Sequence, residues 1–137
     1  MNAKKKITII SILILTIAIC WFKWLEAFAS GIPNKEIEKH VKATGNYIWH
    51  VFSWELLDKS LYLTGESAKK AYDRIDKSEA IFIDWFEDEE TKDITWDLKT
   101  ANAFDDFAEV YVVDKDFKWT YIKTHENMCG PYFMKRK

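Results

Sequence analysis

Residues 110–124 read VYVVDKDFKWTYIKT, and this stretch decides the class of fold. Val110–Val113 and Lys118–Thr124 are rich in β-branched and aromatic residues, which favour strands. The four residues between them include two aspartates, and a short polar connection of this kind joins antiparallel neighbours. We therefore predict a β-hairpin over residues 110–124.

Outward from the hairpin, the pattern predicts two more strands. Ala80–Phe86, AIFIDWF, has the composition of a strand. Tyr47–Trp54, YIWHVFSW, is bulky and mostly apolar at both alternating sets of positions, which predicts a central strand buried on two sides. Other segments are predicted as helices at 34–42, 64–75 and, more weakly, 100–108, and as a turn at 126–131 before Tyr132-Phe133 packs back. This order predicts an α+β domain, with a mixed or antiparallel sheet and helices on one face.

The N-terminus carries a different signal. Ile7–Phe22, ITIISILILTIAICWF, is sixteen residues without a charge, preceded by three lysines. We predict a membrane anchor in residues 1–22 and a single domain in residues 23–137, with the N-terminus cytoplasmic and the domain outside. The alternative is a cleaved signal peptide and a secreted domain, with Ala27-Phe28-Ala29 as the cleavage site.

Charge is distributed unevenly along the chain. The formal net charge is −2, and the three lysines near the N-terminus leave −5 for residues 23–137. No basic stripe interleaved with aromatics is present, which argues against nucleic-acid binding. Residues 84–109 have a net charge of −8 and are predicted to form a solvated loop, with Glu87 and Asp88 as candidates for a binding surface.

Four residues could carry chemistry: His50, His125, Glu126 and Cys129. A histidine can act as a base, and His-x3-Cys with a carboxylate could hold a metal or activate a thiol. The simpler interpretations are a core histidine at position 50 and a polar loop end around position 125. Because the common catalytic motifs are missing from the sequence, we predict neither a metal nor another cofactor.

Trp119 and Tyr121 share one face of the last predicted strand. We interpret this face mainly as core, because a small domain needs its aromatic residues for stability. An exposed patch that receives a partner protein is the alternative interpretation.

Two motifs carry a resemblance to a known family. Trp49-His50-Val51-Phe52-Ser53 and the stretch from Trp119-Thr120-Tyr121 to Thr124-His125-Glu126 resemble a family of small uncharacterised proteins from Gram-positive bacteria. The resemblance covers about residues 23–133. It implies no assigned activity and a membrane segment added to the family domain. The resemblance also favours a retained anchor. The family's opening Trp/Phe helix matches residues 23–29 of this chain, and cleavage after Ala29 would remove it.

Three hypotheses about function follow. The first is a membrane-tethered binding module of the immunity-protein kind. The second is a hydrolytic or metal-dependent enzyme that uses His50, His125, Glu126 and Cys129. The third is a structural protein of the cell envelope without a ligand.

Overall fold

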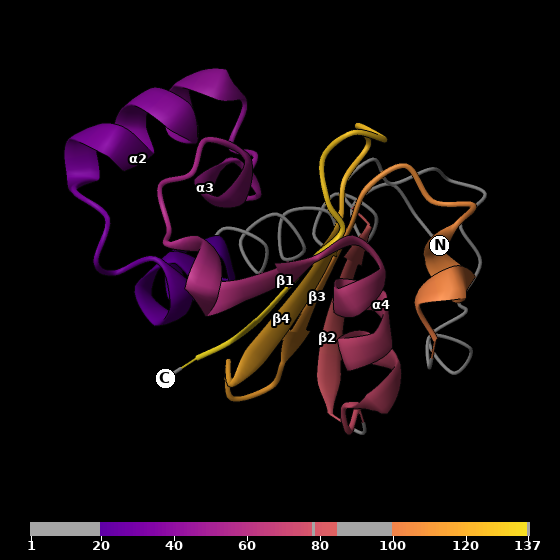
Figure 1. Ribbon diagram of the computed structural model, residues 1–137. Helices are drawn as coiled ribbons and strands as arrows, with labels where there is room; N and C mark the ends of the chain where they lie inside the picture. The colour runs from indigo at the N-terminus through magenta and orange to yellow at the C-terminus, as the bar shows by residue number, and fades with distance from the viewer. Residues whose placement is uncertain (1–19, 78, 85–99, 137) are drawn as a thin grey trace, which may run out of the picture.

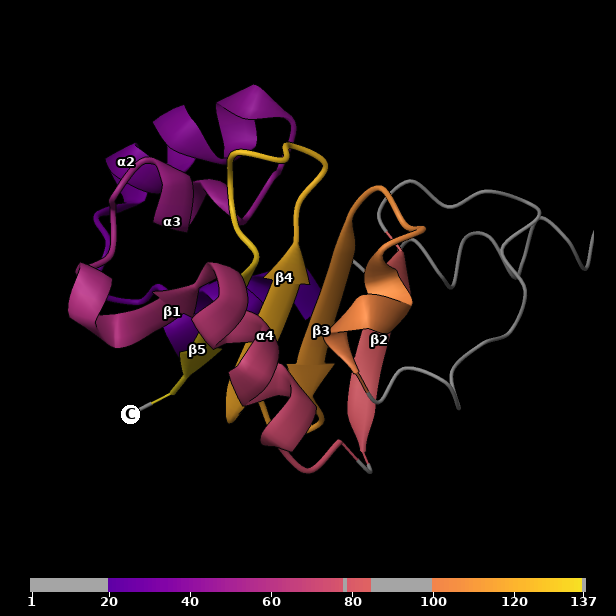
Figure 2. The same ribbon diagram turned by 45° about the vertical axis from the view of Figure 1, so that its right-hand side comes forward.

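A computed structural model describes residues 20–77, 79–84 and 100–136. Its centre is a five-stranded antiparallel sheet with the order β1-β5-β4-β3-β2 (Figure 2). The strands are β1 (Tyr62–Thr64), β2 (Ala80–Asp84), β3 (Val110–Asp114), β4 (Trp119–Lys123) and β5 (Tyr132–Lys135). The predicted α+β fold is confirmed, and of the two kinds of sheet that were left open, mixed or antiparallel, the described strands form an antiparallel one.

The predicted hairpin is β3 and β4, with Val110 opposite Lys123. In the connection between these strands, the Asp114 carboxylate accepts hydrogen bonds from the backbone N–H groups of Asp116 and Lys118. β2 pairs with β3 along its whole length, which confirms the predicted strand as far as residue 84. Residues 85 and 86 lie outside the described residues.

Two strands were not predicted. Tyr132-Phe133 belongs to β5, which lies between β4 and β1, and Phe133 stands opposite Tyr121. β1 is only three residues long, and among the described strands it pairs only with β5. Such long-range pairing leaves no local pattern by which a short strand could be recognised.

The predicted central strand at Tyr47–Trp54 is wrong. The segment forms turns and the short helix α3 (His50–Ser53), and the Trp54 N–H donates to the His50 carbonyl. Ile48, Val51 and Phe52 stand at helical spacing, and each is at most 2 % exposed. The burial of this apolar stripe therefore outweighs the β propensity of the residues.

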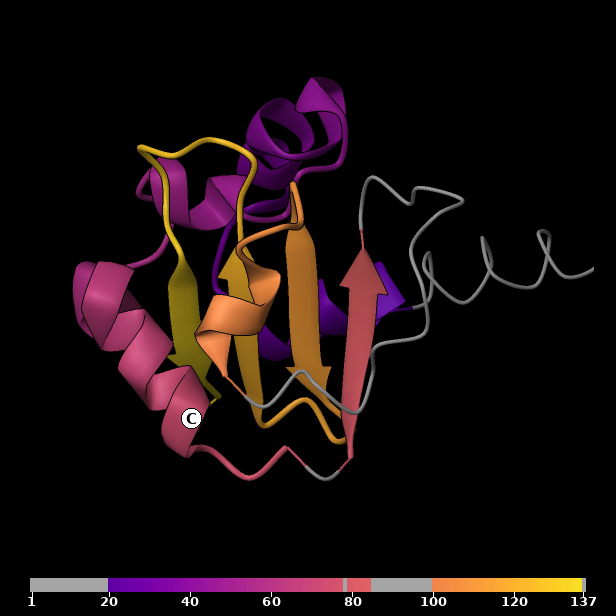
Figure 3. The ribbon, with the colours of Figure 1, turned by 90° about the vertical axis from the view of Figure 1, so that its right-hand side faces the viewer.

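Helices cover both faces of the sheet, rather than one as predicted. On one face lie a helix at 20–28, α2 (Asn34–His40), α3 and the 3-10 turns η1 (Lys42–Thr44) and η2 (Lys59–Leu61). On the other lie α4 (Gly65–Arg74) and the 3-10 helix η4 (Ala101–Phe104), as Figures 1 and 3 show. Each face has its own hydrophobic cluster, so strands β3 and β4 are buried on both sides.

The helix at 20–28 is part of the core. Cys20, Trp24 and Phe28 recur every four residues and are 6 %, 1 % and 4 % exposed. The Trp24 indole N–H donates to the Thr120 hydroxyl of β4 at 2.9 Å, and that hydroxyl donates to the Val112 carbonyl of β3. The N-terminal helix is thereby fixed to the two central strands.

The predicted anchor lies mostly in residues 1–19, outside the described residues. Among the residues that are described, no helix is long and apolar enough to cross a membrane.

Candidate functional site

A fully buried carboxylate lies at one end of the sheet. Glu109 directly precedes β3 and has no exposed surface. Its Oε1 atom accepts from the Trp49 indole N–H at 2.9 Å and pairs with the His125 Nδ1 atom at 2.7 Å. Its Oε2 atom accepts from the Tyr111 hydroxyl at 2.8 Å. We call these four residues the Glu109 network.

The network explains how a charge can be buried here. A carboxylate without donors would be costly in this position, whereas three side-chain donors replace most of its hydration. Burial, followed by the charge of Glu109, holds the pKa of Tyr111 well above its usual range, so the phenol remains a donor. The pairing also orients the imidazole of His125, whose side chain is 31 % exposed.

Glu109 was missed in the sequence. It is one of ten acidic residues between positions 84 and 109, and its neighbours suggest a solvated segment. The available signal was its place immediately before four apolar strand residues. A carboxylate at the start of a strand that is buried on both faces must find partners inside the fold.

His50 is held by other groups. Its Nδ1 atom lies 2.7 Å from the His40 carbonyl oxygen and 2.9 Å from the Thr44 hydroxyl. Its ring contacts the rings of Tyr47 and Trp49, at centroid distances of 5.6 and 4.3 Å.

The same two aromatic rings contact His125, at 5.3 Å from Tyr47 and 5.7 Å from Trp49. The structure therefore brings His50 and His125 to one aromatic pair but gives each its own hydrogen-bond partners.

Glu126 and Cys129 lie in the same loop as His125. One Glu126 carboxylate oxygen is 3.9 Å from His125 Nε2, and the other accepts from the Cys129 thiol at 3.6 Å. Burial, and then Glu126, raises the pKa of Cys129, which keeps the thiol protonated. Reactive thiols have lowered pKa values, so Cys129 lacks this property. Within the described part of the chain, no three His, Cys, Asp or Glu side chains are placed to hold a metal ion.

The four candidates for a binding surface have different locations. Trp119 and Tyr121 are 5 % and 1 % exposed and belong to the cluster beneath α4. Glu87 and Asp88 lie outside the described residues.

Two large apolar side chains are exposed in the segments that carry His50 and His125. Trp54 is 56 % exposed and packs against the His40 ring at 4.8 Å, and the His40 carbonyl meets His50. Met128 is 99 % exposed and lies in the loop of His125. The Thr124 hydroxyl lies within hydrogen-bonding distance of the Glu126 and Cys129 carbonyls of that loop and shares its one proton between them, so the loop is closed by its own polar contacts.

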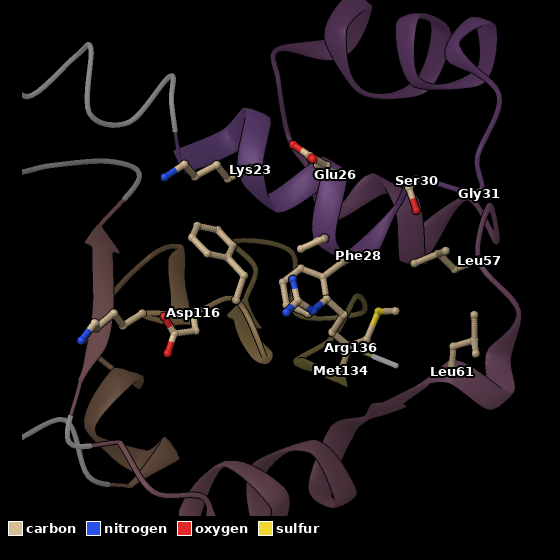
Figure 4. A pocket seen from close by; sticks show the side chains of 13 residues that line it. Lys23, Glu26, Phe28, Ser30, Gly31, Leu57, Leu61, Asp116, Met134 and Arg136 are labelled. Carbon is tan, nitrogen blue, oxygen red and sulfur yellow. The ribbon is translucent and has the colours of Figure 1, made fainter.

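A groove of about 840 Å³ lies at the other end of β3 and β4 (Figure 4). One wall is the exposed side of the N-terminal helix, with Lys23 and Glu26. Asp116 comes from the β3–β4 connection, and Arg136 follows β5. The floor is apolar and includes Phe28, Phe117 and Met134. The groove thus combines an apolar floor with a rim of both charges.

A family model described as a domain of unknown function, DUF4275, matches residues 2–133. The chain belongs to the DUF4275 family. The matched range includes the apolar segment, which the resemblance had treated as an addition to the family. No curated protein and no solved structure matches the chain.

Proposed function

We propose that this DUF4275 protein is a membrane-tethered binding module of the immunity-protein kind, with its domain outside the cytoplasm. The observation that carries the proposal is the helix at 20–28. In sequence, this helix directly continues the apolar run that begins at Ile7. In space, its buried stripe is part of the domain core. The proposed tether therefore runs directly into a core helix of the domain.

Burial of this helix favours retention of the N-terminal segment. Cleavage after Ala29 would remove Cys20, Trp24, Phe28 and Ala29 from the core, where each is at most 6 % exposed. Loss of one buried tryptophan alone costs about 3–5 kcal/mol, a large part of the stability of a small domain. A secreted, cleaved form would lose part of one of its two core clusters.

The same burial leaves no spacer between tether and domain. Because Cys20 packs into the core, the apolar run has thirteen residues, 7–19, before the domain begins. As a helix they would measure about 20 Å, so the ~30 Å hydrocarbon core would have to thin locally for them to span it. Phe22, in the first turns of the domain helix, is 70 % exposed. We infer that the domain lies directly against the bilayer.

The surface around Trp54 and Met128 is the proposed contact with a partner protein. Aromatic and methionine side chains are enriched at protein interfaces. The Glu109 network and the Thr124 hydrogen bonds hold the surrounding segments in place, which reduces the ordering cost of association.

Membrane attachment is tested by extraction with alkaline carbonate. We expect the full chain to remain in the membrane pellet and a variant with Ile12→Asp and Leu15→Asp to be released. A phosphatase reporter fused after Lys137 should be active outside the cytoplasm. Release of the unaltered chain would refute the tether, and a reporter active only in the cytoplasm would refute the orientation.

The partner surface is tested by photocrosslinking in living cells of the source organism. A benzophenone side chain is placed at Trp54, at Met128 or, as a control, at exposed Lys70 of α4. We expect one discrete crosslinked protein from the first two positions and none from the control. Identical products from all three positions, or none from any, would contradict a binding surface here.

A hydrolytic function is the second candidate, and the pairing of His125 with buried Glu109 favours it. A carboxylate that orients an imidazole is a common part of general-base sites. With small ester substrates, His125→Gln should then abolish turnover and His50→Gln should retain it. Absence of turnover above the buffer rate would reject this candidate.

A further inference from the structure

The groove at the β3–β4 connection is lined by the helix that follows the proposed tether. Lys23, on its wall, is the first residue after the apolar run Ile7–Phe22. Lys23, Glu26 and Ser30 are exposed residues of this segment that line the groove, and Phe28 of the buried stripe reaches its floor. If the domain lies directly against the bilayer, this wall stands at the level of the lipid headgroups.

Two cations of the groove have no carboxylate partner among the described residues. Lys42, Lys59, Lys69 and Lys115 each pair with a glutamate. Lys23 and Arg136 make no such ion pair within the described ranges, although both are exposed and line the groove from different elements. No carboxylate of the described residues therefore forms an ion pair that an outside anionic group would have to break.

The domain as a whole is acidic, whereas the charges that line the groove nearly balance. Residues 23–137 carry a net charge of −5. Because Lys115 pairs with Glu79, Lys23 and Arg136 stand against Glu26 and Asp116 in the lining. A ligand that carries an anionic group together with hydroxyl donors therefore matches this lining better than a simple anion does.

The floor and the two carboxylates narrow the class of ligand. Phe28, Phe117 and Met134 form an apolar floor that excludes water from beneath the charged rim. A phosphate between Lys23 and Arg136 would leave Glu26 and Asp116 as acceptors for hydroxyl groups. The volume of about 840 Å³ is within the usual range for a small-molecule site. A phosphate ester that carries hydroxyls fits this set of donors and acceptors.

We propose that the groove binds the headgroup of an anionic, hydroxyl-bearing phospholipid, with phosphatidylglycerol as the simplest example. Lys23 and Arg136 hold the phosphate, and Glu26 and Asp116 accept hydrogen bonds from the glycerol hydroxyls. The lipid comes from the membrane that holds the tether, so this assignment rests on the proposed function. Binding would fix how the domain lies on the bilayer.

The three methionines of the chain allow a direct test. Met134 lines the groove, Met128 lies at the opposite end of the sheet, and Met1 is remote in sequence. The full chain, labelled with carbon-13 at the methionine methyl groups, is kept in maltoside micelles. It is titrated with dihexanoyl phosphatidylglycerol, with the matching phosphatidylcholine, and with glycerol 3-phosphate.

We expect a saturable shift of the Met134 methyl signal with phosphatidylglycerol and no shift of Met128. The double variant Lys23→Gln/Arg136→Gln should bind about 30-fold more weakly, because each cation near an anionic lipid contributes roughly fivefold. Lys70→Gln on α4 is the matched control and should bind like the unaltered chain.

The other outcomes overturn the proposal. An equal response to phosphatidylcholine would show that charge is not recognised. An equal response to glycerol 3-phosphate would assign the site to a soluble phosphate instead of a lipid. Unchanged affinity in the double variant would remove Lys23 and Arg136 from the site. Carbonate extraction tests membrane attachment independently of lipid binding. If carbonate releases the chain but the Met134 methyl signal still shifts with phosphatidylglycerol, only the proposed function is refuted.

Discussion

Replacing Glu109 separates its role as an acceptor from its role as a charge. In Glu109→Ala, the Trp49 indole and the Tyr111 hydroxyl lose their acceptor, and both residues are 1 % exposed. Each buried donor left unsatisfied costs about 1–3 kcal/mol. His125 adds less, because its side chain is 31 % exposed and water can replace the carboxylate. We expect a loss of about 4 kcal/mol in the free energy of unfolding.

Glu109→Gln should cost much less. With its oxygen at the Oε1 position, the amide can still accept from Trp49 and His125. Its NH2 group then faces Tyr111, whose hydroxyl can turn and act as an acceptor. The hydrogen bonds then have a neutral instead of a charged acceptor, which should lower the free energy of unfolding by about 1–2 kcal/mol.

Urea unfolding of the full chain in maltoside, followed by tryptophan fluorescence, measures both variants. Glu126→Gln is the control, since its side chain is 56 % exposed and the change should stay within about 0.5 kcal/mol. If Glu109→Ala matched this control, the network would contribute no stability. If Glu109→Gln lowered the free energy of unfolding as much as Glu109→Ala, the negative charge of Glu109 would matter more than its position as an acceptor. The explanation by acceptor geometry would then be wrong.

Three further predictions concern the helix at 20–28, the buried Tyr132 and the thiol of Cys129. Trp24→Ala should lower the free energy of unfolding by about 3–5 kcal/mol, whereas Phe22→Ala should change it by less than about 0.5 kcal/mol; equal effects in urea unfolding would contradict the burial of this helix. Burial raises the pKa of Tyr132 to about 12, so the unfolded chain loses this proton first and stability should fall as pH rises from about 10 to about 12. Tyr132→Phe should make that fall shallower in circular dichroism at increasing pH, and an unchanged pH profile would argue against it. Glu126 helps to raise the pKa of Cys129. Glu126→Gln should therefore speed alkylation of this thiol by iodoacetamide at pH 8, followed by mass spectrometry. A slower reaction would refute the contact between Glu126 and Cys129.

The elements that were predicted correctly have a local signature. The β3–β4 hairpin joins two strong strand segments by four residues, and α4 has apolar residues at helical spacing from Ala68 to Tyr72. Both patterns are complete within a short window of sequence. Tyr47–Trp54 fits two periods at once, because its aromatic residues favour strands while Ile48, Val51 and Phe52 form a helical stripe. Only the packing against the N-terminal helix and the sheet decides between them.

The site was predicted only in part for a related reason. His125, Glu126 and Cys129 were recognisable as a cluster because they are close in sequence. Glu109 was not, because its partners Trp49 and His125 are 60 and 16 positions away. The alternation of Trp119 and Tyr121 shows that they share a face but not whether another layer covers it. Here α4 supplies that layer, and Tyr72 contacts both rings.

The place of β5 in the sheet has a consequence for biosynthesis. β5 is translated after every other described strand, yet it lies between β4 and β1 and is the only described strand that pairs with β1. The sheet therefore cannot close until Lys135 has been translated. Until then the apolar residues of the N-terminal helix lack part of their final surroundings. A premature stop before Tyr132 would leave β1 without its neighbour and open both core clusters to water, so quality control would meet an unfolded chain rather than a shortened domain.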